Sequence, residues 1–275
     1  MTYRGPLRAV ILDWAGTIVD FGSCAPVQAF VETFRRAGVK ISTAEARGPM
    51  GSAKRDHIAA LLAMPEVAAR WQSANGAAPG DAEVDRLYAD FIPIQLEVLT
   101  RSVDIIPGAP EAISALRERG LKIGSTTGYN RVMMDAVVPA ATKQGLVVDH
   151  VATADTLPSG RPAPWMCFEN MAALGVYPPA ACVKIGDTVP DIDEGLNAGM
   201  WTIAVAATGN EFGLSEAEAA ALPEAERRAR IATATERLQA AGAHYVVDGI
   251  RDAPAVLDQI ALRLANDDHR SSRRA

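Results

Sequence analysis

The sequence predicts an α/β protein with a doubly wound parallel sheet and an inserted α-helical cap domain. Short apolar runs alternate with helix-like stretches over most of the 275 residues. The alternation stops between about residues 25 and 101, where we find helix-like segments and no convincing strand. Polar side chains stand directly after several apolar runs, as they do where open α/β sheets bind their ligands.

Each predicted strand is a short apolar run. Residues 8–12 (RAVIL) come first and end at Asp13. Continuous apolar runs of this length are typical of parallel strands that are buried on both faces. Four later runs look alike, at residues 121–125, 150–153, 182–185 and 201–205, and a last strand is expected at residues 243–247. Helical stretches lie between or after them, at residues 110–119, 165–174 and 253–264. This alternation predicts right-handed βαβ units.

The interruption predicts the domain organisation. We expect residues 1–22 and 102–265 to form the α/β core and residues 23–101 to form the helical cap. Cap segments such as VQAFVETFRRAG and DAEVDRLYADFIPIQLEVL have helical patterning. Residues 104–108 (DIIPG) then return the chain to the sheet, and the Ala/Glu-rich stretch 215–242 predicts solvated surface helices.

Composition and charge narrow the classes of function. A net charge of -6 argues against nucleic acid or an anionic membrane as the main partner. No apolar run approaches the roughly 20 residues that span a bilayer, and the N-terminal run is too short for a signal peptide. Three widely spaced cysteines suit a reducing cytoplasm, where we expect this protein. Residues 266–275 are polar and unpatterned, which predicts a disordered tail.

The polar residues that follow the predicted strands form a chemically coherent set. They are Asp13, the hydroxyl residues 125–127, Arg161 in the loop after residues 150–153, and the pair Asp187 and Asp191. Converging carboxylates repel each other unless a cation lies among them, and a hard oxygen-rich site suits Mg²⁺ with a substrate phosphoryl group. Hydroxyls and a guanidinium add donors for the remaining phosphoryl oxygens. The sequence therefore predicts a magnesium-dependent phosphoryl-transfer site.

Four motifs, in this order, resemble those of the haloacid dehalogenase superfamily. They are DWAGT at residues 13–17, the strand-end hydroxyls 125–127, Arg161 in place of the usual lysine, and GDTVPD at residues 186–191. The resemblance implies a Rossmann-like core and an Asp13 carboxylate that attacks phosphorus and forms an aspartyl-phosphate. It also implies that Mg²⁺ is bound by Asp13, the backbone carbonyl of Ala15, and Asp187.

Two details of this site stay open. Asp191 either binds the metal directly or orients Asp187 or a backbone amide. Among the strand-end hydroxyls we prefer Thr126 and Thr127 as phosphate contacts, without choosing between them.

One position departs from the superfamily pattern. Phosphatases and mutases with these motifs usually carry a second aspartate two residues after the nucleophile, as the general acid for the leaving oxygen. Here that residue is Ala15, which cannot donate a proton. The protein is therefore either impaired in ester hydrolysis or acts on a leaving group that needs no acid at this point.

The predicted cap favours the second alternative. Its segment at residues 46–57 (ARGPMGSAKRDH), together with DWAGT, GSTTGY, GRPAPWM and GDTVPDI, resembles the phosphonatase family. The resemblance implies that Lys54 forms a Schiff base with phosphonoacetaldehyde, which provides an electron sink when the carbon–phosphorus bond breaks. It also suggests a homodimer that forms through the cap.

Lys54 must be partly neutral near pH 7 to act in this way. Its pKa would have to fall by about 2–3 units, which desolvation under the cap would favour. His57 lies three residues further on, so a helix would place it on the same face, where it either relays protons or packs. Two rival functions remain: a phosphate-ester phosphatase or phosphomutase with a relaxed acid requirement, and a catalytically silent metabolite-binding protein.

Overall fold

The computed structural model, which describes residues 3–101 and 103–266, contains a six-stranded sheet. Its order is β3-β2-β1-β4-β5-β6, and all the pairings are parallel. The strands are β1 (Ala9–Leu12), β2 (Lys122–Thr127), β3 (His150–Thr153), β4 (Cys182–Gly186), β5 (Trp201–Val205) and β6 (Tyr245–Val247). Every predicted strand is present, and the predicted fold class, a doubly wound α/β sheet, is confirmed.

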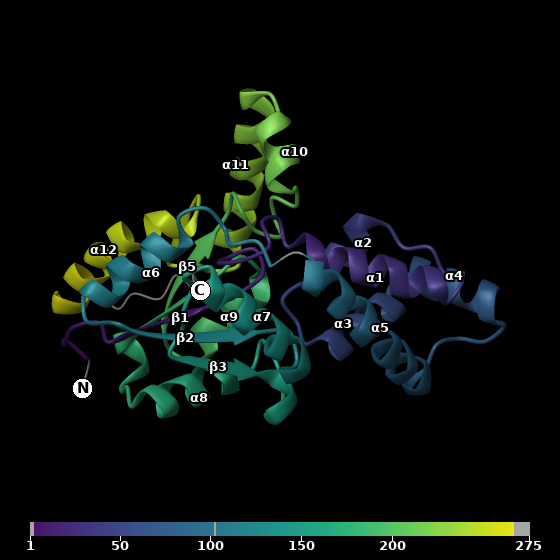
Figure 1. Cartoon of the computed structure of the whole chain (residues 1–275), viewed down its shortest axis with the longest axis horizontal. Helices are drawn as coiled ribbons and strands as arrows, with labels where there is room; N and C mark the ends of the chain where they lie inside the picture. Colours follow the sequence, from purple (N-terminus) through teal and green to yellow (C-terminus); the bar gives the residue numbers. More distant parts are fainter. Residues whose placement is uncertain (1–2, 102, 267–275) are drawn as a thin grey trace.

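Helices cover both faces of this sheet (Figure 1). Alternate residues of β1 point to opposite faces, so Val10 and Leu12 belong to one apolar cluster while Ala9 and Ile11 belong to another. The first cluster includes residues of α6 (Ala109–Glu118), α7 (Arg131–Lys143) and α12 (Ala253–Ala265). On the opposite face lie α8 (Trp165–Leu174), α9 (Val189–Asn197) and α11 (Glu224–Ala240). Both faces of β1 are buried, which explains its uninterrupted apolar sequence.

The register of the central strands places the polar strand ends side by side. Leu12, the last residue of β1, pairs with Ser125 of β2 and with Ile185 of β4. The backbone N–H of Asp13 also donates to the carbonyl oxygen of Ile185 at 2.8 Å. Residues that follow β1, β2 and β4 therefore meet at one edge of the sheet.

Five helices lie between β1 and α6 and gather beside this edge, on the right of Figure 1. They are α1 (Cys24–Arg36), α2 (Thr43–Arg47), α3 (Lys54–Ala63), α4 (Pro65–Asn75) and α5 (Asp81–Arg101). Phe30 of α1 stacks on Phe91 of α5 with ring centroids 4.4 Å apart, so this group has apolar packing of its own. We call these helices and their connections the cap, with the predicted bounds 23–101.

Some segments differ from their predicted form. Residues 104–108, expected to return the chain to the sheet, form an isolated antiparallel bridge between Ile105 and Val19. Helix α7 was not predicted from the sequence. The predicted surface helices are present as α10 (Glu216–Ala221) and α11, which project from the top of Figure 1. Apart from Asn266, the predicted tail at residues 266–275 lies outside the described residues.

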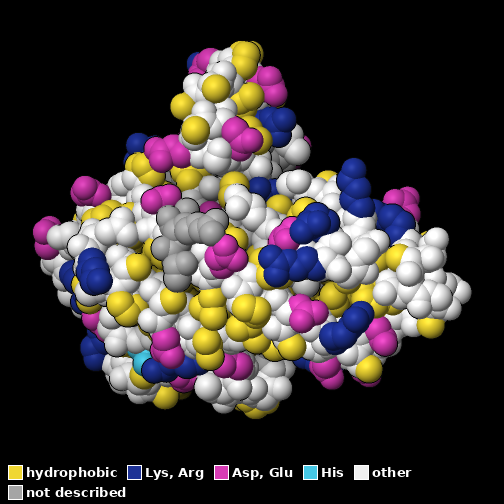
Figure 2. Space-filling view, turned by 45° about the vertical axis from the view of Figure 1, so that its right-hand side comes forward, with side chains coloured by type: hydrophobic (Ala, Val, Ile, Leu, Met, Phe, Trp, Pro, Cys, Tyr) yellow, Lys and Arg dark blue, Asp and Glu magenta, His cyan; other side chains and the backbone are white. Residues whose placement is uncertain are grey.

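The distribution of surface charge and the apolarity of the helices match what the composition predicted. Acidic and basic side chains are interspersed on the face that Figure 2 shows. None of the helices in the described part of the chain combines the length and apolarity needed to cross a bilayer.

Candidate active site

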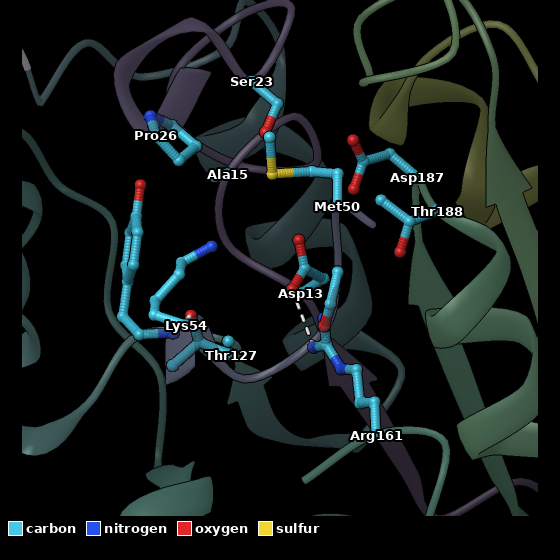
Figure 3. Close-up of a pocket in the computed structure, with 13 residues that line it drawn as sticks. Asp13, Ala15, Ser23, Pro26, Met50, Lys54, Thr127, Arg161, Asp187 and Thr188 are labelled. Atoms are coloured by element: carbon cyan, nitrogen blue, oxygen red, sulfur yellow. Dashed lines mark hydrogen bonds and ion pairs between the residues drawn. The ribbon is translucent and has the colours of Figure 1, made fainter. Parts of the chain in front are cut away.

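A cavity lies where the cap meets the carboxyl edge of the sheet (Figure 3). The core lines it with Asp13, Ala15, Thr127, Gly128, Tyr129, Arg161, Asp187 and Thr188, and the cap and its connection line it with Ser23, Pro26, Met50, Gly51 and Lys54. Most of the predicted site residues therefore share one enclosure. The exceptions are Thr126, His57 and Asp191, which do not line the cavity.

Arg161 organises the core side of this cavity. Its Nη2 donates to Asp13 Oδ1 at 2.7 Å, the contact marked by a dashed line in Figure 3, and to Thr126 Oγ1 at 2.6 Å. Its Nε donates to Glu194 Oε2 at 2.9 Å, and its Nη1 lies 3.0 Å from Asp191 Oδ1. A buried guanidinium is thus held by three buried carboxylates, which fixes its plane beside the proposed nucleophile.

Lys184 adds a second buried cation beneath the site. Its Nζ lies 2.6 Å from Asp191 Oδ1 and 3.7 Å from Glu194 Oε2. Thr188 Oγ1 donates to the other Asp191 oxygen at 2.5 Å. Burial opposes ionisation of Asp191, but Arg161 and Lys184 outweigh it and lower its pKa. Since both oxygens of Asp191 already accept hydrogen bonds, the geometry favours a role in holding the two cations.

Three carboxylates could hold a metal ion here. Oxygen atoms of Asp13, Asp187 and Asp191 lie within 4.8 Å of one another, and all three residues are buried. Burial, followed by repulsion from Asp13 and Asp191, raises the pKa of Asp187 well above its usual value. Asp187 Oδ1 is buried without a hydrogen-bond partner among the described residues. An orphaned oxygen beside converging carboxylates fits a divalent cation, which would remove the repulsion.

The turn after β1 leaves room for Asp187. Gly16 has φ of 86°, in the left-handed region, and a Cβ there would lie 2.1 Å from Asp187 Oδ2. A side chain at this position would both strain the backbone and displace the carboxylate. The DWAGT motif therefore requires glycine at this position, because the carboxylate of Asp187, which follows β4, lies close to the turn.

Lys54 supplies the cap side of the cavity and lies in different surroundings. It is the first residue of α3, is only 5% exposed, and points its ammonium toward the cavity in Figure 3. Nζ lies 5.0 Å from the centroid of the Tyr129 ring and 5.7 Å from that of Phe30. Burial lowers the pKa of Lys54 to about 8, although Asp13 acts in the opposite direction. A sizeable fraction of this amine is therefore neutral near pH 7 to 8.

The side chains of Thr126 and Thr127 point to opposite faces of β2. Thr127 borders the cavity and accepts a hydrogen bond from the Tyr129 N–H at 3.1 Å. Thr126 points the other way, where its hydroxyl donates to Glu194 Oε2 at 3.0 Å and accepts from Arg161. Thr127 is thus placed to meet a substrate oxygen, whereas Thr126 helps to hold Arg161.

His57 lies on α3 but faces away from the cavity. Its ring stacks on Phe30 with centroids 3.8 Å apart, and Nε2 lies 2.9 Å from the carbonyl oxygen of Ala46. Burial, with a smaller effect of Lys54, lowers the pKa of His57 well below its usual value. The geometry favours the packing alternative for this residue over proton relay.

Three residues near the site were not predicted from the sequence. Glu194 lies three residues after Asp191 on α9, so helical spacing was a signal that both face the sheet. Lys184 could also have been identified, because a charged residue inside a buried strand needs a partner of opposite charge. Tyr129, which packs beside Lys54, had no signal of this kind, since its contacts depend on how the cap docks.

Comparisons with known proteins show which family this chain belongs to. A family model for haloacid dehalogenase-like hydrolases matches residues 7–199. A phosphonoacetaldehyde hydrolase from Nitratidesulfovibrio vulgaris is 48% identical over 97% of this chain and 95% of its own length. One from Aeromonas hydrophila is 51% identical, with 94% of each chain covered. The crystal structure of a phosphonoacetaldehyde hydrolase like protein from Oleispira antarctica matches with a TM-score of 0.95 and 41% identity, over 97% of this chain and 96% of that chain.

Proposed function

The chain belongs to the haloacid dehalogenase-like hydrolase family, and from that premise we propose that it hydrolyses the carbon–phosphorus bond of phosphonoacetaldehyde to acetaldehyde and phosphate. One observation carries the proposal. A buried lysine, Lys54, borders the same cavity as Asp13, while the position two residues after Asp13 is Ala15. The site therefore offers an amine for an aldehyde and lacks the usual acid for an ester oxygen.

The reaction begins on the cap side. The neutral amine of Lys54 attacks the aldehyde carbon, the resulting carbinolamine takes up a proton from solvent and loses water, and a protonated imine forms. A pKa of about 8 keeps part of the lysine neutral at physiological pH, so the attack needs no separate base to deprotonate it. The imine nitrogen then stands two bonds from the carbon that carries phosphorus, which makes it an electron sink for that bond.

The second step takes place on the core side. An oxygen of Asp13 attacks phosphorus as the carbon–phosphorus bond breaks, and the bonding electrons move into the imine to give an enamine. Arg161, whose Nη2 lies 2.7 Å from Asp13 Oδ1, reduces the repulsion between the carboxylate and the anionic phosphonate. Water then hydrolyses the aspartyl-phosphate, and the enamine takes up a proton at carbon before hydrolysis frees acetaldehyde and Lys54.

The metal in this proposal is Mg²⁺. When bound, it would neutralise charge on the transferring phosphoryl group. Asp13, the backbone carbonyl of Ala15 and Asp187 would hold it, and the unpartnered Oδ1 of Asp187 supports that assignment. Direct coordination by Asp191 remains a weaker alternative, because its oxygens are engaged by Lys184, Arg161 and Thr188.

An assay of both products tests the proposal against an ester phosphatase. With phosphonoacetaldehyde, the purified protein and Mg²⁺ should release phosphate and acetaldehyde in equal amounts. Simple phosphate esters should be poor substrates, and Ala15→Asp is the matched variant that restores the usual acid position. Efficient hydrolysis of esters by the unchanged protein, without release of acetaldehyde from the phosphonate, would favour the rival function.

Two further expectations belong with this proposal. We propose a homodimer formed through the cap, which light scattering of the protein with and without charged substitutions on the exposed cap surface would test. We also propose a cytoplasmic location, which the free cysteines Cys24, Cys167 and Cys182 support. Cell fractionation would check it.

A further inference from the structure

Arg47, the last residue of α2, connects the cap to the core outside the cavity. Its half-buried guanidinium donates from Nη1 to the carbonyl oxygen of Gly22 at 2.7 Å and to Asn210 Oδ1 at 3.1 Å. Nη2 lies 3.7 Å from Cys24 Sγ. One cap side chain therefore contacts both the connection between the two parts of the chain and a loop of the core.

Asn210 in turn contacts a candidate metal ligand. Its backbone N–H donates to Asp187 Oδ2 at 2.7 Å, and its side-chain amide donates to the carbonyl oxygen of Arg47 at 3.4 Å. Asn210 is only 6% exposed. The loop that carries Asn210 is thus fixed from one side by the cap and from the other by a carboxylate of the site.

The surroundings of Asp187 make its orientation depend on this loop. A Cβ at Gly209 would lie 2.4 Å from Asp187 Cβ, so the backbone next to Asn210 already touches the carboxylate's side chain. The bond to Asn210 occupies Oδ2 and leaves Oδ1 as the oxygen without a partner among the described residues. A shift of the loop would therefore turn the oxygen that faces the other carboxylates.

We propose that Asn210 is a positioning residue for Asp187, and that Arg47 makes this positioning depend on the docking of the cap on the core. Cap docking and divalent-metal affinity are then coupled, and the coupling acts in both directions: bound metal stabilises the docked cap, and the docked cap strengthens metal binding. This inference rests on the metal site of the proposed function and does not depend on which substrate is cleaved.

Metal binding by the full chain without substrate tests the coupling. The probe is Mn²⁺, followed by electron paramagnetic resonance, with Mg²⁺ competition. Arg47→Met should weaken Mn²⁺ binding about fivefold or more. Asn210→Ala keeps its backbone N–H but loses the contact to Arg47, so it should weaken binding to a similar extent. The double variant should be little worse than Asn210→Ala alone, because that substitution already removes the contact between Asn210 and the Arg47 guanidinium.

Arg70→Met is the matched control. Arg70 contacts Glu45 and the carbonyl oxygen of Lys40, all within the cap, so its loss should leave Mn²⁺ affinity unchanged. Unchanged affinity in folded Arg47→Met and Asn210→Ala would overturn the inference, as would additive losses in the double variant. Should Arg47→Met not fold, Arg47→Lys, which cannot make both Nη contacts, gives the same test. Failure of the unchanged protein to bind Mn²⁺ would instead refute the metal site itself.

Discussion

The core side and the cap side of the cavity differ in the groups that surround their buried charged residues. On the core side, Arg161 is surrounded by Asp13, Asp191 and Glu194, so ions are stabilised by other ions. On the cap side, Lys54 faces the rings of Phe30 and Tyr129, and no described residue forms an ion pair with it. The core therefore favours the charged forms of Arg161 and Asp191, whereas the cap favours a neutral amine at Lys54.

This difference separates the two halves of the proposed reaction. Phosphoryl transfer needs fixed positive charge near an anionic nucleophile, and imine formation needs an uncharged one. If the two surroundings act independently, a substitution on one side should disturb its own step and spare the other. The following changes test that independence, from the largest expected effect to the smallest.

Asp13→Asn removes the nucleophile but keeps the shape of the side chain. Phosphate release should fall by about 10⁴-fold or more. The substitution should leave the cap's own packing in place and lower the pKa of Lys54 further, because the Asp13 carboxylate raises it. Single-turnover assays of phosphate would measure the loss. Residual activity within tenfold of the unchanged protein would show that another group accepts the phosphoryl group.

Lys54→Met removes the amine from the cap side. Cleavage of the carbon–phosphorus bond should fall by about 10³-fold or more, since no electron sink forms. The variant should also unfold a few degrees higher, because an apolar side chain avoids the desolvation cost of a buried ammonium. Activity assays and thermal unfolding would check both effects. A large loss of stability would mean that the ammonium is well solvated or paired in the folded protein.

Glu194→Gln weakens one of the three carboxylate contacts of Arg161. We expect activity to fall about tenfold and the free energy of unfolding to fall by about 1–3 kcal/mol, because a charged acceptor is replaced by a neutral one. Glu169→Gln is the control, since Glu169 pairs with His150 and does not line the cavity. Equal effects of the two substitutions would argue against a special role for Glu194.

The smallest effect concerns the pKa of Lys54. The rate of imine formation should rise about tenfold per pH unit below pH 8 and level off above it, because only the neutral amine reacts. Phe30→Leu should admit water, raise this pKa toward 10.5 and slow the reaction a few-fold at pH 7. Rates of borohydride reduction with acetaldehyde, measured across pH, would show the shift. An unmoved midpoint would mean that desolvation by Phe30 is not its cause.

The sequence was sufficient for the sheet and for most of its strand-end residues. Buried parallel strands have continuous apolar runs, and residues that follow such strands must meet at one edge. That geometry brings Asp13, Arg161 and Asp187 together without any detail of side-chain packing. Ala15 could be identified as a departure only through the resemblance to the haloacid dehalogenase motifs, because strand geometry does not say which residue belongs two positions after Asp13.

Other features depend on packing between distant segments. The pleat of β2 separates Thr126 from Thr127, but only the docking of Arg161 and Glu194 shows which side faces the cavity. His57 was expected near Lys54, yet its ring stacks on Phe30 of another helix. Helical spacing alone could not predict which of two neighbouring faces the cap would turn toward the core.

The central claim is that Lys54 forms a covalent imine with the substrate before Asp13 accepts the phosphoryl group. Incubating the Asp13→Asn variant with phosphonoacetaldehyde and borohydride, followed by peptide mass spectrometry, tests it most directly. We predict one reduced adduct, on the peptide that contains Lys54, with a mass that retains the phosphonate group. An adduct on a different lysine, or no adduct in a folded variant, would contradict the account.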